Sequence, residues 1–466
     1  MDPKVDRCLA ALARALPDDR VVLDPDVRRA HGGDESGLGA ALPDAVVRAH
    51  DAAEVAAVLR ACSAEGVPVT PRGAGTGKSG GAIPVAGGIV LACDRMRGLV
   101  ELDRGDAIAV VEPGLVTASL HEAVEREGLF WGPDPSSSAE CTIGGNVACN
   151  AAGPRSFKYG ATRDWVLGLE VVTGDGQTLR LGRRTRKGST GYDLTSLVVG
   201  SEGTLAVVTR AILRLAPLPE RTMAILAFLP GLDAVAPAIE AALRTRTVPR
   251  SIEMLDPQTL DLVRHGAAFP IPEAARALLV VEVDGRGDEV ERDTLVIAEA
   301  LSGATPLDPA IARTDAERER FWSVRRQMSR ALRASAAHKL SEDVVVPRSR
   351  IGALVERCGA IARARGIRMP AYGHAGDGNL HVNLLWDQPA QEPAVQLAIR
   401  ELFEATVALG GTLSGEHGLG ATKAPHLGLE HSAEQIALGR RIKASFDPAG
   451  VLNPGKVFPP LGHGPC

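Results

Sequence analysis

"RGAGTGKSGG", residues 72–81, is the stretch that decides the fold, because it matches two nucleotide-binding motifs and fits the context of neither. Its glycines satisfy G-x-G-x-x-G, and its GKS resembles the end of a Walker A loop. Both motifs must open a helix. The chain continues instead with "GGAIPVAGGIV", residues 80–90, which is no helix, and the first Walker A glycine would fall on Arg72. What remains is an anion-binding nest of backbone N–H groups, or a plain surface loop.

Two more glycine clusters in the same region favour the nest over the plain loop. They are "TIGGNVACNAAG", residues 142–153, and "GSEGTLAVV", residues 200–208. Short apolar runs between the clusters, such as "GIVLAC" and "AIAVVEPG", predict buried strands. Turns alone explain one glycine cluster easily but three clusters poorly. We therefore expect an extended dinucleotide that lies across a sheet.

Size and composition limit the class of protein. The 466 residues exceed what one core organises, so at least two domains are expected, and the net charge of −5 disfavours nucleic-acid binding. The seven cysteines form no C-x-x-C pair, which predicts free thiols in a reducing compartment and no iron–sulfur site. Residues 1–19 predict an amphipathic helix, and the apolar stretch 223–243 contains acidic residues and prolines. We expect a cytoplasmic protein.

Periodicity divides the chain near "PLP", residues 217–219. Before it, residues 51–66 predict a helix, residues 132–215 read as strands and glycine loops, and "EVVTGDGQTLRL", residues 170–181, predicts a hairpin. Beyond it, strands and helices alternate, with a long helix over residues 315–334. This alternation indicates an α/β or α+β domain.

"GHAGDGNLHVNLL", residues 373–385, contains two histidines in an otherwise apolar stretch. A two-residue turn at Asp377-Gly378 would place His374 directly opposite His381, with Cβ atoms about 5 Å apart. Such a pair suits either two imidazoles on one metal ion or a hydrogen-bonded core pair.

"SGEHGLG", residues 414–420, favours the metal. Glu416 and His417 lie there in a glycine-flanked loop, where catalytic pairs often occur, although an exposed loop pair is the alternative. Two histidines and one carboxylate form an open catalytic site for Zn²⁺, or for Mn²⁺ or Fe²⁺.

The glycine clusters, together with "PRSFKYGATRDWVLGLEVVTGDG" and "GYDLTSLVVGSEGTLAVV", closely resemble the flavin domain of FAD-linked oxidases. The family is the vanillyl-alcohol-oxidase/p-cresol-methylhydroxylase superfamily. "GHAGDGNLH" and "EHG" are similar to motifs of its D-lactate dehydrogenase, glycolate oxidase flavoprotein and D-2-hydroxyglutarate dehydrogenase branch. The resemblance covers roughly residues 40–460.

For the first part of the chain, the resemblance implies FAD with its pyrophosphate on residues 72–77. It also implies a closing segment, residues 447–459, that returns to the flavin. The loop 72–81 contains neither His nor Cys, so non-covalent FAD is expected. The cofactor-binding residues implied are Arg72, Gly73, Ala74, Gly75, Thr76, Gly77, Gly80, Pro135, Ser136, Thr142, Gly144, Gly145, Asn150, Gly153, Glu202, Gly203, Val208 and Asn453.

For the second part, the resemblance assigns the metal ligands and the reacting groups. A divalent metal, with Zn²⁺ expected first, would bind His374, His381 and Glu416, and His417 would be the base. Arg325 would hold the substrate carboxylate as a catalytic residue. The other substrate-binding candidates are Ser329, Lys339 and Asn383, and the lysine position of the family matches either Lys339 or Ser341.

The fold class expected is α+β. A two-part FAD-binding domain of the p-cresol-methylhydroxylase type, residues 1–217 (core about 40–217), would precede an α/β substrate- and metal-binding cap domain with an antiparallel sheet, residues 218–444. Residues 445–466 would return to the FAD domain.

The function expected is metal-assisted oxidation of a D-2-hydroxy acid, of D-lactate or glycolate type, to the 2-oxo acid by hydride transfer to flavin. Electrons would leave to a quinone, an electron-transfer flavoprotein, a cytochrome or an iron–sulfur partner subunit, and such a partner could hold the protein at the inner face of the membrane. A homodimer is one expected arrangement. Alternatives are a D-2-hydroxyglutarate dehydrogenase, an ether-lipid synthase-like enzyme, an aromatic-alcohol oxidase, or a nucleotide-binding regulator without redox turnover.

Overall fold

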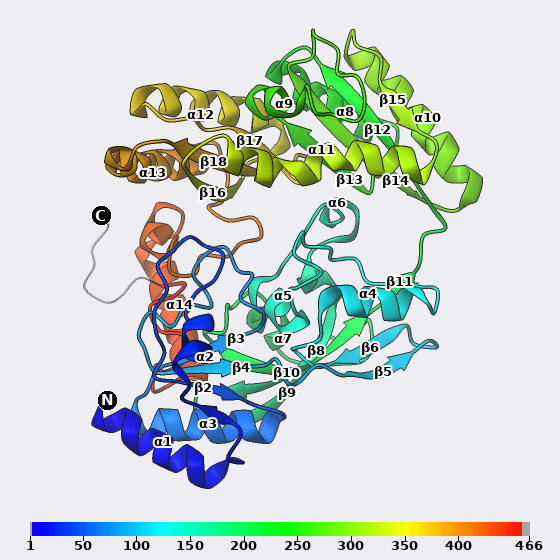
Figure 1. Ribbon diagram of the computed structural model, residues 1–466. Helices are drawn as coiled ribbons and strands as arrows, with labels where there is room; N and C mark the ends of the chain where they lie inside the picture. Colours follow the sequence, from blue (N-terminus) through cyan, green and yellow to red (C-terminus); the bar gives the residue numbers. More distant parts are fainter. Residues whose placement is uncertain (1, 459–466) are drawn as a thin grey trace. The chain divides into compact units, whose positions relative to one another are not determined.

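The computed structural model in Figure 1 describes residues 2–458. Its contacts divide the chain into two compact units. The first unit comprises residues 1–153, 160–218 and 416–466, and the second comprises residues 154–159 and 219–415. Relative to the domain limits expected from the sequence, residues 416–444 lie in the first unit and residues 154–159 in the second, and those limits stay a prediction.

Two sheets form the first unit. The smaller one, in the order β1-β2-β4-β3, has parallel pairs of β4 with both β2 and β3, and the larger one, β5-β6-β10-β8-β9, is antiparallel. A short ribbon pairs β7 with β11. The strands are β1 Val21–Val22, β2 Ala45–Arg48, β3 Val69–Arg72, β4 Ile89–Ala92, β5 Leu99–Asp103, β6 Ile108–Val111, β7 Leu129–Phe130, β8 Val166–Thr173, β9 Thr178–Gly182, β10 Ala206–Arg214 and β11 Ala216–Pro217.

The helices of the first unit follow local capping chemistry. Helix α3 begins where the Asp51 side chain accepts from Glu54 N and ends at Gly66 in the left-handed conformation, as its sequence predicts. The hairpin of β8 and β9 is also confirmed. The helices are α1 Pro3–Ala15, α2 Pro25–Ala30, α3 Ala52–Glu65, α4 Thr117–Glu125, α5 Ile143–Cys149, α7 Leu194–Val198 and α14 Ala433–Phe446.

One expectation for the first unit is wrong. The second glycine cluster, read as a loop, contains helix α5, which ends at Asn150 in the left-handed conformation. Its Gly144 lies against Pro113, where an added Cβ would come within 2.6 Å of the proline Cβ. Glycine is therefore used here for close packing of a helix against a neighbouring segment.

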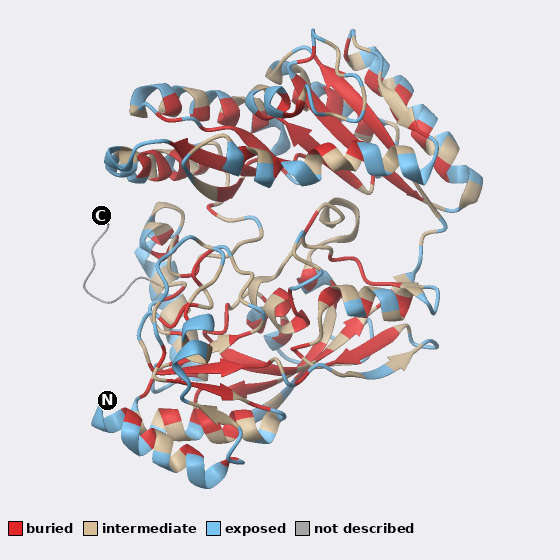
Figure 2. Cartoon of the chain, viewed as in Figure 1, coloured by how far each residue is buried: buried red, intermediate tan, exposed pale blue. Residues whose placement is uncertain are grey.

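A seven-stranded sheet forms the centre of the second unit. Its order is β15-β12-β14-β13-β17-β18-β16, and every pairing is antiparallel, as expected for the cap domain. Figure 2 shows these strands as largely buried. They are β12 Arg221–Leu229, β13 Ser251–Leu255, β14 Ala277–Gly285, β15 Ala310–Ala312, β16 His338–Val345, β17 Ala371–His374 and β18 Asn379–Trp386.

Helices cover this sheet, with α8 packed on α10 and α12 packed on α13 (Figure 1). The long predicted helix is confirmed as α11, which begins with a capping box between Thr314 and Glu317. Segment 154–159 joins the unit because Lys158 and Tyr159 bind the buried carboxylate of Asp284. The helices are α6 Ser156–Tyr159, α8 Val235–Arg244, α9 Pro257–Val263, α10 Gly287–Ala304, α11 Asp315–Ala334, α12 Ile351–Arg365 and α13 Glu392–Ala408.

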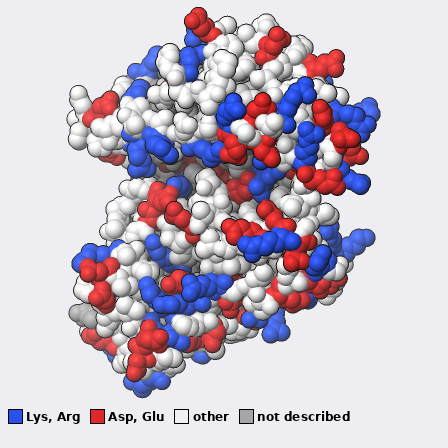
Figure 3. Space-filling model, turned by 45° about the vertical axis from the view of Figure 1, so that its right-hand side comes forward, with Lys and Arg blue, Asp and Glu red and all other residues white. Residues whose placement is uncertain are grey.

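The charged side chains and the cysteines are arranged as the composition predicts. On the face shown in Figure 3, basic and acidic side chains are interspersed. The six described cysteines are free thiols, and Cys466 lies outside the described residues. Within residues 2–458, no helix combines the length and the apolar character needed to cross a bilayer.

Candidate functional site

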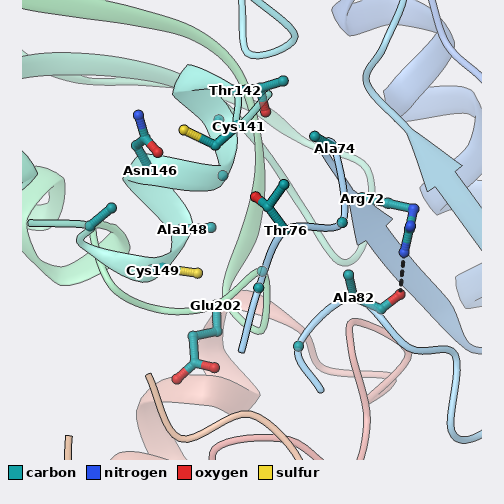
Figure 4. A pocket seen from close by; sticks show the side chains of 18 of the residues that line it. Arg72, Ala74, Thr76, Ala82, Cys141, Thr142, Asn146, Ala148, Cys149 and Glu202 are labelled. Atoms are coloured by element: carbon teal, nitrogen blue, oxygen red, sulfur yellow. Dashed lines mark hydrogen bonds between the residues drawn. The ribbon is translucent and has the colours of Figure 1, made fainter. Parts of the chain in front are cut away.

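A cavity of about 380 Å³ lies in the first unit, between the glycine-rich loop that follows β3 and helix α5 (Figure 4). The segment before β10 closes it further, and Glu416 and His417 also contribute to its wall. The predicted cofactor residues that line the cavity are Arg72, Gly73, Ala74, Gly75, Thr76, Gly77, Pro135, Ser136, Thr142, Gly144, Gly145, Glu202, Gly203 and Val208.

Four predicted cofactor residues lie outside this lining. Asn453 donates from Nδ2 to the carbonyl oxygens of Gly81 and Glu202, both of which belong to lining residues. Asn150 ends helix α5 and accepts a hydrogen bond from Arg163 N. The other two, Gly80 and Gly153, have positive φ, as Asn150 and Asn453 do. Of the four, Asn453 therefore contacts the cavity wall through its amide.

The conformation of the glycine-rich loop depends on Arg72. Its buried guanidinium donates to the carbonyl oxygens of Gly33 and Ala82, the second of which Figure 4 shows as a dashed line. Burial lowers the pKa of this guanidinium. Gly75 has φ +78° and lies against the same group, so an added Cβ would come within 2.0 Å of Arg72 Nη2. Arg72 thus fixes the loop through the carbonyl oxygens of Gly33 and of Ala82, the residue directly after the loop.

One polar side-chain atom in the cavity wall is free to bind a ligand. Thr142 Oγ1 is buried in the wall and has no hydrogen-bond partner within residues 2–458, as expected for a group that binds a ligand. Thiols in the wall, which the sequence analysis did not place there, include Cys93 and Cys149. Burial raises the pKa of both thiols to about 12, so they stay protonated and unreactive at neutral pH.

Glu202 fixes the segment that carries His417 to the cavity wall. Its backbone has φ +53°, and its carboxylate accepts from Leu419 N and Gly420 N at 2.8 and 2.7 Å. Burial raises the pKa of this carboxyl to about 6, although the two N–H groups favour its charged form. Ser79 Oγ donates to the His417 carbonyl oxygen at 2.9 Å. The backbone of residues 417–420 is therefore fixed at the cavity wall.

In the second unit, strands β17 and β18, which carry the two histidines, pair in a different register from the one predicted. His374 pairs with Asn379, and His381 pairs with Tyr372, so the two histidines are diagonal neighbours and not directly opposed. The reason is a four-residue connection, in which Asp377 N donates to the His374 carbonyl oxygen. Both histidines stay on one face of the sheet, because the shift is two residues. Their ring centroids are 5.2 Å apart.

The two histidines belong to a cluster that can hold a metal ion. One ligand atom each from His374, His381 and Glu416 lie within 4.8 Å of one another. Glu416 is joined by its peptide bond to Gly415, the last residue of the second unit, and Gly415 N donates to the buried carboxylate of Asp343 at 2.7 Å. Asp343 thus fixes the backbone that leads to Glu416.

Glu253, on β13, was missed by the sequence analysis. Its carboxylate is fully buried, with Oε1 2.5 Å from His374 Nδ1 and Oε2 accepting from Arg325 Nε at 2.5 Å. Burial by itself raises the pKa of this carboxyl, but the charges of His374 and Arg325 outweigh that and lower it to about 2. The signal in the sequence is an acidic residue in the middle of the apolar strand "SIEML".

The other predicted substrate residues lie on the same elements. Lys339 Nζ donates to Ser329 Oγ at 3.3 Å, which brings these two candidates together. Asn383 is fully buried and donates from Nδ2 to the His381 carbonyl oxygen. Ser341 pairs directly with Asn383. Both Lys339 and Ser341 therefore lie on the histidine face of the sheet.

Models of known protein families match both parts of the chain. Residues 218–457 match the model for the C-terminal domain of FAD-linked oxidases, and residues 43–182 match an FAD-binding domain. The chain belongs to the FAD-linked oxidases. Membership of this family shows that the chain binds FAD. The fold is similar to that of p-cresol methylhydroxylase with substrate bound, with a TM-score of 0.81 and 16% identity over 100% of this chain and 98% of that chain.

Similar proteins place the chain in one group within the FAD-linked oxidases. The chain is 40% identical to glycolate oxidase subunit GlcD of Bacillus subtilis (strain 168), over 90% of this chain and 89% of that protein. It is 36% identical to D-lactate dehydrogenase of Archaeoglobus fulgidus (88% and 90%). It is 34% identical to D-2-hydroxyglutarate dehydrogenase of Xanthomonas citri pv. viticola (98% and 97%). The protein is an oxidoreductase of this 2-hydroxy-acid group.

Proposed function

We propose that the protein is a metal-assisted dehydrogenase that oxidises a D-2-hydroxy acid, of D-lactate or glycolate type, to the 2-oxo acid with non-covalent FAD. The observation that carries the proposal is the cluster of His374, His381 and Glu416, whose ligand atoms lie within 4.8 Å of one another. Two imidazoles and one carboxylate leave coordination positions open for substrate oxygens, with Zn²⁺ as the first candidate and Mn²⁺ or Fe²⁺ as alternatives.

Bound FAD supplies a hydride acceptor, and a bound divalent cation lowers the pKa of the substrate hydroxyl and orients it. The protein's own residues supply the rest. Arg325 binds the substrate carboxylate, since a guanidinium forms charge-assisted hydrogen bonds to it. His417, held at the cavity wall by its carbonyl contact with Ser79, accepts the hydroxyl proton. Asn383 supports the backbone of His381.

D-2-Hydroxyglutarate is the alternative substrate, favoured by the relative from Xanthomonas citri. Lys339, beside Ser329 on the histidine face, offers the cation that a second carboxylate needs. A monocarboxylate makes no use of that cation. Comparing the two substrate classes therefore tests the role of Lys339.

The first experiment is anaerobic mixing of the purified, FAD- and Zn²⁺-loaded protein with D-lactate, L-lactate, glycolate and D-2-hydroxyglutarate, while flavin absorbance is followed. Bleaching by a D-acid or by glycolate supports the proposal and names the substrate. A bound flavin that none of these acids bleaches would contradict it. Electron acceptors, whether quinone, electron-transfer flavoprotein, cytochrome or iron–sulfur partner, are then compared by the rate at which each restores the flavin absorbance.

A further inference from the structure

Glu253 is a buried carboxylate at the centre of strand β13. The strand is buried along its whole length, and Glu253 has none of its side chain exposed. A buried carboxylate is strongly destabilising unless charged or hydrogen-bonding partners compensate it. Such a residue in the middle of a sheet is therefore expected to have a specific purpose.

Each carboxylate oxygen of Glu253 contacts one predicted site residue. Oε1 lies 2.5 Å from Nδ1 of the candidate metal ligand His374, and Oε2 accepts from Nε of the candidate substrate residue Arg325. The three residues are brought together from β13, β17 and α11. One side chain thus connects the predicted metal site to the predicted carboxylate site.

The contact with His374 selects the tautomer of that imidazole. A carboxylate only accepts hydrogen bonds, so Nδ1 must carry the proton. In the neutral imidazole, Nε2 is then the nitrogen that can bind a metal ion. A carboxylate on the far nitrogen also makes the imidazole a more basic ligand. Loss of the carboxylate should therefore weaken metal binding even when both histidines are present.

The contact with Arg325 sets the plane of the guanidinium. Because Nε donates to Glu253, a two-point contact with a substrate carboxylate would use the two terminal nitrogens. The Tyr372 ring supports the same group, with its centroid 4.5 Å from Arg325 Cζ. The Tyr372 ring also lies 5.4 Å from the His381 ring, measured between centroids. Arg325 and both histidines are therefore linked through two shared neighbours.

The geometry points to Glu253 as the positioning residue that orients both His374 for the metal and Arg325 for the substrate carboxylate. Metal affinity and substrate affinity are then coupled through one side chain that touches neither ligand. This inference rests on the proposed function, since it takes Arg325 as the group that holds the carboxylate of a 2-hydroxy acid.

The test compares Glu253→Gln and Glu253→Asp with a matched control, Glu282→Gln, all in the FAD-loaded full chain. Glu282 is also buried, on the neighbouring strand β14, where it accepts from Trp322 Nε1 on the same helix as Arg325. Zn²⁺ affinity of the metal-stripped proteins is measured by competition with a chromophoric chelator. The KM of the acid that bleaches the wild-type flavin is measured in parallel.

Glu253→Gln should weaken Zn²⁺ binding by about 10- to 100-fold and raise KM, because the neutral amide no longer fixes the tautomer or pairs with the guanidinium. Glu253→Asp keeps the charge and should recover part of both losses. Glu282→Gln should leave the Zn²⁺ affinity unchanged. If Glu253→Gln does not fold, the inference is tested with Glu253→Asp, whose Zn²⁺ affinity should be lower than that of wild type.

Three results separate the failure of this inference from that of the proposed function. Wild-type bleaching together with unchanged Zn²⁺ affinity and KM in both Glu253 variants overturns the inference alone. An equal loss of Zn²⁺ affinity in Glu282→Gln also overturns it, since any buried carboxylate would then serve. Weaker Zn²⁺ binding in Glu253→Gln, with no hydroxy acid that bleaches the wild type, supports the orientation of His374 and removes the proposed function.

Discussion

The cavity of the first unit and the histidine pair of the second unit, His374 and His381, are built from different materials. Glycine backbone and loop carbonyls form much of the cavity wall, and the buried Arg72 in that wall binds the protein's own carbonyl oxygens. Ring nitrogens form the histidine pair, in which the buried Glu253 carboxylate contacts the His374 ring and the two rings lie 5.2 Å apart between centroids. Backbone provides a shape for a cofactor, whereas side chains provide the reacting and metal-binding groups. Changes in the two regions should therefore have separable effects.

The largest effect is expected from His374→Ala. Loss of one of two imidazoles should reduce flavin bleaching by substrate about 10³-fold or more, which corresponds to about 4 kcal/mol, because metal binding fails. Bound FAD should stay at the wild-type level, since the cavity lies in the other unit. Anaerobic stopped-flow absorbance measures both. His265→Ala, which removes an exposed histidine of the same unit, is the control, and unchanged bleaching in His374→Ala would remove the metal from the mechanism.

Arg325→Ala should have the next largest effect. Without the guanidinium, kcat/KM should fall about 100-fold, or about 2.7 kcal/mol, for every 2-hydroxy acid, as expected for a lost charge-assisted contact. Steady-state kinetics with D-lactate, glycolate and D-2-hydroxyglutarate check this. Arg326→Ala is the control, because Arg326 is an exposed neighbour paired with Glu319. An effect confined to the dicarboxylate would show that Arg325 binds the distal group instead.

Glu202 should give the first unit a pH dependence of stability. Its pKa is raised from the ordinary 4.5 to about 6, so the folded state binds the proton more tightly than the unfolded state between these values. Stability contributed by this group therefore falls as pH rises from about 4.5 to about 6, by about 2 kcal/mol in all. Urea unfolding of wild type and Glu202→Gln across this range isolates the effect. A stability difference between the two proteins that does not change with pH would refute it.

The smallest effect is expected from Gly75→Ala. A non-glycine residue at φ +78° costs about 1–2 kcal/mol, and the added Cβ also meets Arg72. The glycine-rich loop should distort, and FAD should bind about tenfold more weakly, while Zn²⁺ affinity stays at the wild-type value. Flavin fluorescence and the chelator competition measure these two quantities. Gly428→Ala is the control, since no atom lies within 4 Å of its added Cβ. Loss of Zn²⁺ in Gly75→Ala would mean that the two regions are not separable.

The sequence predicted the two regions to different extents, because the cavity is built mainly from backbone and the histidine pair from side chains. Glycines report backbone requirements locally, so most predicted cofactor residues line the cavity, yet the same glycines concealed helix α5. The histidine face was predicted from period two, but the register was missed because the connection has four residues and not two. Glu253 was missed because its partners, Arg325 and His374, lie 72 and 121 residues away along the chain. No local pattern reports such contacts.

The order of synthesis adds a constraint on the first unit. Strand β3 has a neighbour from the end of the chain, since Val69 N donates to the Val451 carbonyl oxygen and Asn453 N donates to the Val69 carbonyl oxygen. Residues 219–415, nearly all of the second unit, leave the ribosome before residues 451–453 do. During translation, the edge of β3 therefore stays without this neighbour until residues 451–453 have been made. A chain that stalls shortly before residue 451 would therefore lack one neighbour of β3, the strand that leads into the glycine-rich loop of the cavity.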